Sequence, residues 1–278
     1  RFKCDWSSDV CSSDLLQGGG YHFKAASPER AGTYVENDRP VSIPDDFFSS
    51  DTFTDRLIGF IDKHRTDGKP FFAYAAYTAP HWPLQAPPAL IAKYKGRYDA
   101  GYASIRAERL ARLQRLGIVA EGATVHTPLT ATSTLPDWNS LSGEQKALEA
   151  RRMETYAALV DNLDHNIGRL IQHLKDIGQY ENTAIFFLSD NGAEGHVVRE
   201  FVPPAADNRL ENIGKASSYV YYGARWAEVG ATPFRLSKGF TSEGGVTSPA
   251  IARLPGAAAG GNRPALATVQ DLAPTFLA

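Results

Sequence analysis

The stretch that decides the fold reads Thr183-Ala-Ile-Phe-Phe-Leu-Ser-Asp190-Asn191-Gly192-Ala193-Glu194-Gly195. Its apolar run, from Ala184 to Leu188, is too short for a core helix and predicts a strand buried on both faces of a mostly parallel sheet. Ligands of open α/β sheets collect beyond the carboxyl ends of the strands, where Asp190 and Asn191 would lie. Their side chains offer the oxygen atoms that Ca²⁺ or Mg²⁺ binds, and Gly192 permits a sharp turn. The stretch therefore indicates an α/β fold with a candidate metal site.

The same residues have a second interpretation, which is an ordinary surface turn. Asn-Gly after an apolar strand is common turn chemistry, and on these residues alone the turn is the favoured interpretation. The choice between the two depends on other segments of the chain.

The composition is that of an ordinary globular protein. Of the 278 residues, 43% are hydrophobic, and the formal net charge is −2. The isoelectric point is near 6.4. Nothing in this balance indicates nucleic acid or an acidic membrane surface as a partner, and no apolar run reaches the length of a membrane span. The first residues lack the basic-then-apolar layout of a signal peptide, and the length suits one large α/β domain.

Residues 1–20 are treated separately, because they show no helical or strand period and contain both cysteines of the chain, Cys4 and Cys11. The segment from Cys4 to Leu15 resembles an in-frame translation of a sequencing-library adapter, so we expect residues 1–20 to be a non-native or disordered tail. A real tail with a Cys4–Cys11 disulfide is the alternative. Residues 21–278 contain no cysteine, which excludes a disulfide framework and a cysteine-based zinc site there.

A second apolar run, from Phe71 to Tyr77, predicts another buried strand, and a distinctive loop follows it. The loop reads Ala79-Pro80-His81-Trp82-Pro83-Leu84-Gln85-Ala86-Pro87. Its prolines stiffen the backbone and fix where His81 and Trp82 point. A histidine in a loop is usually an exposed residue without a catalytic role. At the end of a strand and beside a stiff bend, His81 is also a candidate for proton transfer.

Several helices are expected around these strands. Ser50 and Asp51 are predicted to cap a helix that ends near Gly68 and buries Phe53, Leu57, Phe60 and Ile61 on one face. Residues 89–95 and 104–116 predict short helices. A capping box at Ser142 opens a long helix to Gly178. Its apolar stripe, which we expect to cover the sheet, consists of Tyr156, Val160, Leu163, Ile167, Leu170 and Leu174.

A glycine-rich segment from Arg235 to Gly245 carries Lys238 and precedes a strand-like run bounded by Pro249 and Pro255. A lysine in such a loop is normally a solvated surface charge. When glycine turns hold it beside a strand end, it can instead pair with an anionic ligand. Lys238 is therefore a third candidate site residue.

Taken together, these three segments resemble one family, the sulfatases, and in particular bacterial arylsulfatases. The resemblance is carried by the loop from Ala79 to Pro87, by Ser189 to Gly195, and by Lys238 with the following Phe240-Thr-Ser-Glu-Gly-Gly245. The Asp-Asn-Gly element alone is shared across a wider phosphatase-like superfamily, whereas the three segments in this order and spacing are specific. Residues 21–278 are thus expected to form a partial catalytic domain of the alkaline-phosphatase-like type, with a mostly parallel sheet flanked by helices.

The resemblance implies a sulfuric ester hydrolase that acts on a small-molecule sulfate ester. Sulfatases of this kind use a formylglycine, made from a cysteine or serine in a Cys/Ser-x-Pro/Ala-x-Arg motif, and a Ca²⁺ that polarises the sulfate oxygens. By this resemblance Asp190 and Asn191 are two ligands of Ca²⁺, rather than of Mg²⁺. His81 contacts the sulfate or protonates the departing alkoxide, and Lys238 holds the sulfate and neutralises charge on the leaving oxygen.

Elements that the family carries upstream are missing from the chain. These are the formylglycine motif, an Asp-Asp strand and a Gly-Lys-Trp-His element; neither Cys4 nor Cys11 is followed by the required Pro and Arg. We therefore expect a fragment, truncated at its C-terminus as well, whose nucleophile lies in the missing upstream region. Such a chain is expected to be inert and to bind Ca²⁺ weakly, while the complete gene product hydrolyses sulfate esters.

Two other functions stay open on the sequence. A phosphatase or phosphonate monoester hydrolase of the same superfamily differs in the nucleophile, which this chain does not contain. A non-catalytic binding domain would leave His81 and Lys238 as surface residues and Asp190-Asn191-Gly192 as a turn. The location, bacterial cytoplasm or periplasm, is equally open.

Overall fold

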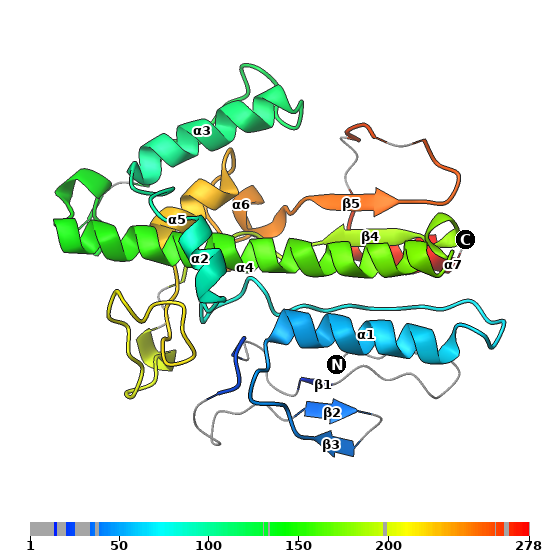
Figure 1. Cartoon of the computed structure of the whole chain (residues 1–278). Helices are drawn as coiled ribbons and strands as arrows, with labels where there is room; N and C mark the ends of the chain where they lie inside the picture. Colours follow the sequence, from blue (N-terminus) through cyan, green and yellow to red (C-terminus); the bar gives the residue numbers. More distant parts are fainter. Residues whose placement is uncertain are drawn as a thin grey trace.

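The computed structural model describes residues 14–15, 21–25, 34–36, 39–129, 131–132, 134–196, 199–258, 260–263 and 267–277. Its longest element is helix α4 (Gly143–Asp176), which crosses the molecule in Figure 1 and packs against α1 (Ser49–His64) and α2 (Pro88–Lys93). The other elements are β1 (Asp14–Leu15), β2 (Tyr34–Glu36), β3 (Arg39–Val41), α3 (Gly101–Arg115), η2 (Trp138–Ser140), η3 (Tyr180–Asn182), β4 (Ile185–Leu188), η4 (Arg199–Phe201), α5 (Gly223–Ala231), α6 (Glu243–Val246), β5 (Ala250–Arg253), η5 (Val269–Asp271) and α7 (Leu272–Leu277).

Helix α4 begins where the sequence predicts. The Ser142 hydroxyl accepts a hydrogen bond from the Gln145 N–H at 3.2 Å, and the Gln145 side chain accepts one from the Ser142 N–H at 2.8 Å. This reciprocal pair is the predicted capping box, and it satisfies amide groups that would otherwise lack partners at the first turn.

The apolar stripe of α4 only partly has the predicted role. Its residue Leu174 is buried in a cluster with Leu57, Phe60 and Ile61 of α1, against which Ile185 of β4 also packs. Val160, in contrast, is 40% exposed. Helix α4 therefore covers α1 as well as β4. Helix α1 lies alongside part of α4 (Figure 1).

Helix α1 is present, but Ser50 and Asp51 do not cap it. The N-cap is Phe48, which makes no side-chain hydrogen bond to the helix. The Asp51 carboxylate instead accepts hydrogen bonds from the amides of Asn162 and Asn166 on α4, at 3.0 and 2.6 Å. Asn162 and Asn166 are buried and need an acceptor, so a tertiary contact replaces the predicted local one.

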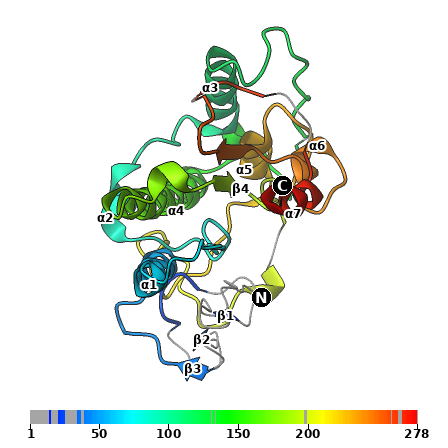
Figure 2. The same cartoon turned by 90° about the vertical axis from the view of Figure 1, so that its right-hand side faces the viewer.

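The predicted strand at 184–188 forms β4, and the run between Pro249 and Pro255 forms β5. The two pair in an antiparallel register with Phe187 opposite Ile251. Helix α4 lies beside this pair in both views (Figures 1 and 2). The predicted burial on both faces is wrong, because Phe187 is 42% exposed, Leu188 38% and Ile251 66%. All strand pairs within the described ranges are antiparallel, so the predicted parallel sheet is not seen there.

The segment from Phe71 to Tyr77 is not a strand. Residues 71–77 are not assigned to any strand, and Phe72 and Tyr74 are 48% and 53% exposed. The prediction of a buried strand fails here because an apolar run is buried only where neighbouring strands and helices cover it.

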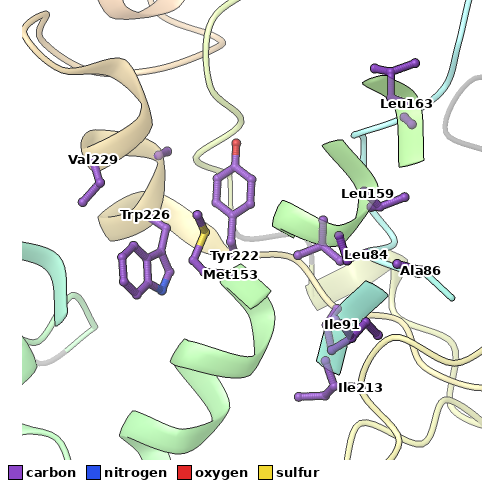
Figure 3. Close-up of a cluster of buried hydrophobic side chains, with 14 of the residues drawn as sticks. Leu84, Ala86, Ile91, Met153, Leu159, Leu163, Ile213, Tyr222, Trp226 and Val229 are labelled. Atoms are coloured by element: carbon purple, nitrogen blue, oxygen red, sulfur yellow. The ribbon is translucent and has the colours of Figure 1, made fainter. Parts of the chain in front are cut away.

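The loop that carries His81 contributes side chains to the main core. Leu84 and Ala86 of this loop are buried to 1% and 0% exposure, together with Leu159 of α4 and Trp226 of α5. Figure 3 shows Leu84, Ala86 and Leu159 near Ile91 of α2, and Trp226 beside Met153 of α4. Burial of each large apolar side chain contributes roughly 2 kcal/mol, so the core holds the loop firmly against α2, α4 and α5.

Of the expected tail, residues 1–20, the structure describes only Asp14–Leu15, which pair with β2. Cys4 and Cys11 lie outside the described residues. Within the described ranges, none of the helices combines the length and the apolar character that crossing a membrane requires.

Candidate active site

The loop after β4 lies directly on the segment that carries Lys238. The Lys238 N–H donates to the carbonyl oxygen of Ala193 at 2.8 Å, and the Gly192 N–H donates to that of Gly245 at 2.9 Å. A Cβ atom on Gly192 would lie 2.0 Å from the carbonyl oxygen of Gly244. Only glycine therefore allows the two backbones to approach this closely. Two of the three segments singled out in the sequence are thus neighbours in space.

Asp190 and Asn191 lie in the loop that follows β4, which ends at Leu188. Asp190 is exposed and Asn191 half-buried. Neither side chain has a hydrogen bond or ion pair with another part of the described chain; the Ser189 hydroxyl donates only to the backbone carbonyl of Asn191, at 3.0 Å. Oxygen donors without protein partners suit a hard cation, but Ca²⁺ takes six to eight oxygen ligands. In the described part of the chain no group of three or more His, Cys, Asp or Glu side chains could hold a metal ion. The two residues fit as part of a ligand set and cannot hold an ion alone.

Lys238 is paired with a carboxylate that the sequence analysis gave no role. Its Nζ lies 3.2 Å from Oε2 of Glu194, whose side chain is 14% exposed. Burial by itself raises the pKa of the Glu194 carboxyl, but hydrogen bonds from the backbone and ring of His196 and from Lys238 outweigh it and lower the pKa below its ordinary value. Glu194 is therefore an anion at neutral pH. The sequence signal was an acid and a histidine two residues apart directly after the Asp-Asn-Gly turn.

His81 is half-buried, and its own loop fixes its tautomer. The ring Nδ1 lies 2.7 Å from the carbonyl oxygen of Trp82. A carbonyl only accepts, so Nδ1 carries the hydrogen atom, and Nε2 is the nitrogen that can exchange a proton with a ligand. The proton-transfer role of His81 stays a prediction.

The backbone of His81 rests on a buried histidine, His22, which sequence analysis missed. Nε2 of His22 lies 2.8 Å from the carbonyl oxygen of His81, and Nδ1 lies 3.1 Å from the Ser49 hydroxyl. Burial lowers the pKa of His22 from 6.5 to about 4, although the hydrogen bond to His81 works against this shift. His22 is thus neutral, donates to His81 and accepts from Ser49. No local pattern marks it, because its partners lie far away in the sequence.

Within the described residues, no hydrogen bond or ion pair joins His81 directly to Asp190, Asn191 or Lys238. The two regions are linked through residues 219–222. The ring of Trp82 lies 5.8 Å from that of Tyr219, and the Tyr222 hydroxyl accepts a hydrogen bond from the Glu194 N–H at 2.9 Å. His81 therefore shares a supporting segment with the Lys238 region.

A cavity of ≈ 1000 Å³ lies elsewhere, between the first turns of α4 and residues 204–211. None of the predicted site residues lines it. The candidate site is accordingly the open region around the loop after β4, and the cavity does not define it.

The family model and the related proteins that match this chain agree on one family. A family model described as Sulfatase matches residues 5–278. The chain is 43% identical over 258 residues to an uncharacterized sulfatase of Schizosaccharomyces pombe, covering 87% of this chain and 46% of that protein. It is 38% identical over 275 residues to an arylsulfatase of Klebsiella aerogenes, covering 94% of this chain and 58% of that protein. The chain thus spans about half the length of these relatives.

Among solved structures, the crystal structure of Ps i-CgsB matches with a TM-score of 0.50 at 21% identity. The match covers 87% of this chain and 39% of that chain. At this identity the likeness concerns the fold alone, and it supports the predicted α/β class.

Proposed function

Because the chain belongs to the sulfatase family, we propose that its complete gene product is an arylsulfatase-type sulfuric ester hydrolase. The observation that carries the proposal is the contact between the loop after β4 and the Lys238 segment. This contact puts oxygen donors for a cation and an ammonium group for an anion in one region, as hydrolysis of a sulfate ester requires.

Each residue has a distinct task under this proposal. Asp190 and Asn191 supply two oxygen ligands for the divalent cation that sulfatases generally use, here Ca²⁺; when bound, such a cation polarises the sulfate oxygens. Lys238 binds the sulfate group as a point charge. Its ion pair with Glu194 at 3.2 Å orients the ammonium group. The proposal assigns the formylglycine nucleophile of the family to none of the printed residues, because neither cysteine has the required Pro and Arg after it.

His81 acts as the proton donor. Cleavage of the sulfate ester leaves negative charge on the bridging oxygen, and a protonated Nε2 of His81 can donate to that oxygen. The hydrogen bond from Nδ1 to the Trp82 carbonyl, at 2.7 Å, keeps Nε2 as the exchanging nitrogen throughout.

Substitutions in the complete gene product test the proposal. We expect His81→Ala and Lys238→Ala each to lower kcat/KM for nitrocatechol sulfate by at least about 100-fold, because each removes a group that stabilises the leaving oxygen or the sulfate. His165→Ala, on the exposed surface of α4, is the matched control and should leave turnover unchanged.

The same assay separates the alternatives. Parallel measurements with an aryl phosphate and a phosphonate monoester report the related activities of the superfamily. Faster turnover of either than of the sulfate ester would contradict the sulfatase proposal. Turnover that is equal in wild type, His81→Ala and Lys238→Ala would contradict the tasks given to these two residues. The absence of turnover of all three substrates by wild type would leave only the binding-domain interpretation.

A further inference from the structure

His196 lies in the candidate site and has no task in the proposed chemistry. Its backbone N–H donates to Oε1 of Glu194 at 2.8 Å, and its ring Nδ1 makes a short hydrogen bond to the same oxygen. An ionised carboxylate only accepts, so Nδ1 carries the hydrogen atom and Nε2 is left for another partner. Within the described residues Nε2 has no hydrogen-bond partner, and the side chain is 51% exposed.

Glu194 holds this imidazole next to Lys238. One carboxylate oxygen binds the His196 ring, and the other lies 3.2 Å from the Lys238 ammonium group. The imidazole ring and the ammonium group are therefore separated by a single carboxylate. Both side chains therefore contact the same carboxylate group.

The backbone provides space for the ring beside Lys238. Gly239, the next residue, has a φ of 90°, in the left-handed region that favours glycine. A Cβ atom at this position would lie 2.6 Å from both Cε1 and Nε2 of His196. The imidazole thus rests on the Gly239 backbone, and any larger residue there would displace it.

The charges of the region make the protonation of His196 important. Asp190 and Glu194 contribute two carboxylates and Lys238 one ammonium group. The cation proposed at Asp190 and Asn191 and a protonated His196 would each add positive charge that favours an anion. Tyr222, which accepts a hydrogen bond from the Glu194 backbone, stays neutral because burial raises the pKa of its phenol. A protonated imidazole beside the anion would strengthen its binding roughly ten-fold at a protein surface.

We propose that His196 is a substrate-binding residue, whose protonated Nε2 donates to the oxygen atoms of the sulfate group beside Lys238. This inference rests on the proposed function and deepens it. The site then takes a tetrahedral oxyanion between an ammonium and an imidazolium group that share Glu194. We expect its affinity for the sulfate group to be higher when the His196 imidazole carries a proton.

The test measures binding of inorganic sulfate to the complete gene product by isothermal titration calorimetry, with CaCl₂ present and the ionic strength constant. Wild type, His196→Gln and the control His165→Gln are compared at about pH 5.5 and pH 8.5, on either side of the ordinary histidine pKa. We expect wild type and control to bind sulfate roughly ten-fold more tightly at the lower pH, and His196→Gln to lose this gain. Because His81 is a second histidine of the candidate site, the comparison is repeated in a His81→Gln background, where the effect of His196 should persist.

Equal sulfate affinity of wild type and His196→Gln at both pH values would overturn the inference, as would the absence of sulfate binding by wild type. Hydrolysis of an aryl sulfate is measured separately. A protein that binds sulfate through His196 but hydrolyses no sulfate ester would contradict the proposed function and support the anion-binding role of His196.

Discussion

A proton added to His22 would oppose the contacts that hold the backbone of His81. The neutral ring accepts a hydrogen bond from Ser49 through Nδ1, and this acceptor is lost when Nδ1 is protonated. The pKa of His22 is about 4 in the folded chain and 6.5 in the absence of burial. The unfolded chain therefore takes up a proton at higher pH than the folded chain does. Stability is unaffected by His22 above pH 6.5 and falls as the pH decreases from 6.5 to about 4.

We expect His22 to reduce the free energy of unfolding by up to roughly 1.4 kcal/mol per pH unit in this interval, and by about 3 kcal/mol in total. Urea unfolding of the chain between pH 7 and pH 4 measures the effect. His22→Gln should show a distinctly shallower loss of stability than wild type, whereas His165→Gln should follow wild type. The same pH dependence in wild type and His22→Gln would contradict the assignment of a buried, neutral His22.

At the scale of elements, Gln85 connects the loop from Ala79 to Pro87 with two distant segments. Its Oε1 accepts hydrogen bonds from the N–H groups of His22 and Phe23, at 3.1 and 3.4 Å. Its Nε2 donates to the carbonyl groups of Ala216 and Ser218, at 3.3 and 3.0 Å. The side chain is fully buried. One amide thus fixes three segments that contain no regular secondary structure of their own.

Gln85→Leu preserves most of the volume but leaves these backbone groups without partners. We expect a loss of about 2–4 kcal/mol in the free energy of unfolding, because buried donors and acceptors are costly when unsatisfied. Urea unfolding at pH 7 measures this loss. Gln172→Leu, at an exposed position of α4, is the matched control and should change stability by less than about 0.5 kcal/mol. A similar change in both variants would show that the Gln85 network contributes little.

At the scale of the whole molecule, apolar surface remains uncovered on the β4–β5 pair. Phe187 and Ile251 are opposite each other in the register, so they lie on the same face, and they are 42% and 66% exposed. Contiguous exposed apolar surface and an open strand edge both favour association with other surfaces.

We therefore expect the 278-residue chain to self-associate and to bind the dye ANS through this face. The double variant Phe187→Thr, Ile251→Thr should self-associate less in sedimentation equilibrium and should give weaker ANS fluorescence. Threonine keeps the strand propensity and removes apolar area. Leu116→Thr, at an exposed position after α3, is the control and should have no effect. A chain that stays monomeric and does not bind ANS at about 100 μM would contradict this expectation.

Features that depend on neighbouring residues were predicted from the sequence, whereas features that depend on distant segments were not. The capping box at Ser142 and the helix that buries Leu57, Phe60 and Ile61 were predicted correctly, because their signals lie within a few residues. The strand at 184–188 was predicted correctly, but its burial was not, since burial depends on distant segments. The cap assigned to Asp51 failed for the same reason, because Asn162 and Asn166 compete for its carboxylate.

The sequence by itself determined the family, the helices with local start signals, and the residue types at 81, 190, 191 and 238, because motifs and periodicity are properties of neighbouring residues. Only the tertiary structure decided that Glu194 bridges Lys238 and His196, and that the His22 ring donates a hydrogen bond to the backbone carbonyl of His81. These contacts arise from chain segments that are brought together by the common core around Leu84 and Trp226. Burial and long-range hydrogen bonds, which no local pattern encodes, therefore set the charge and orientation of the candidate site.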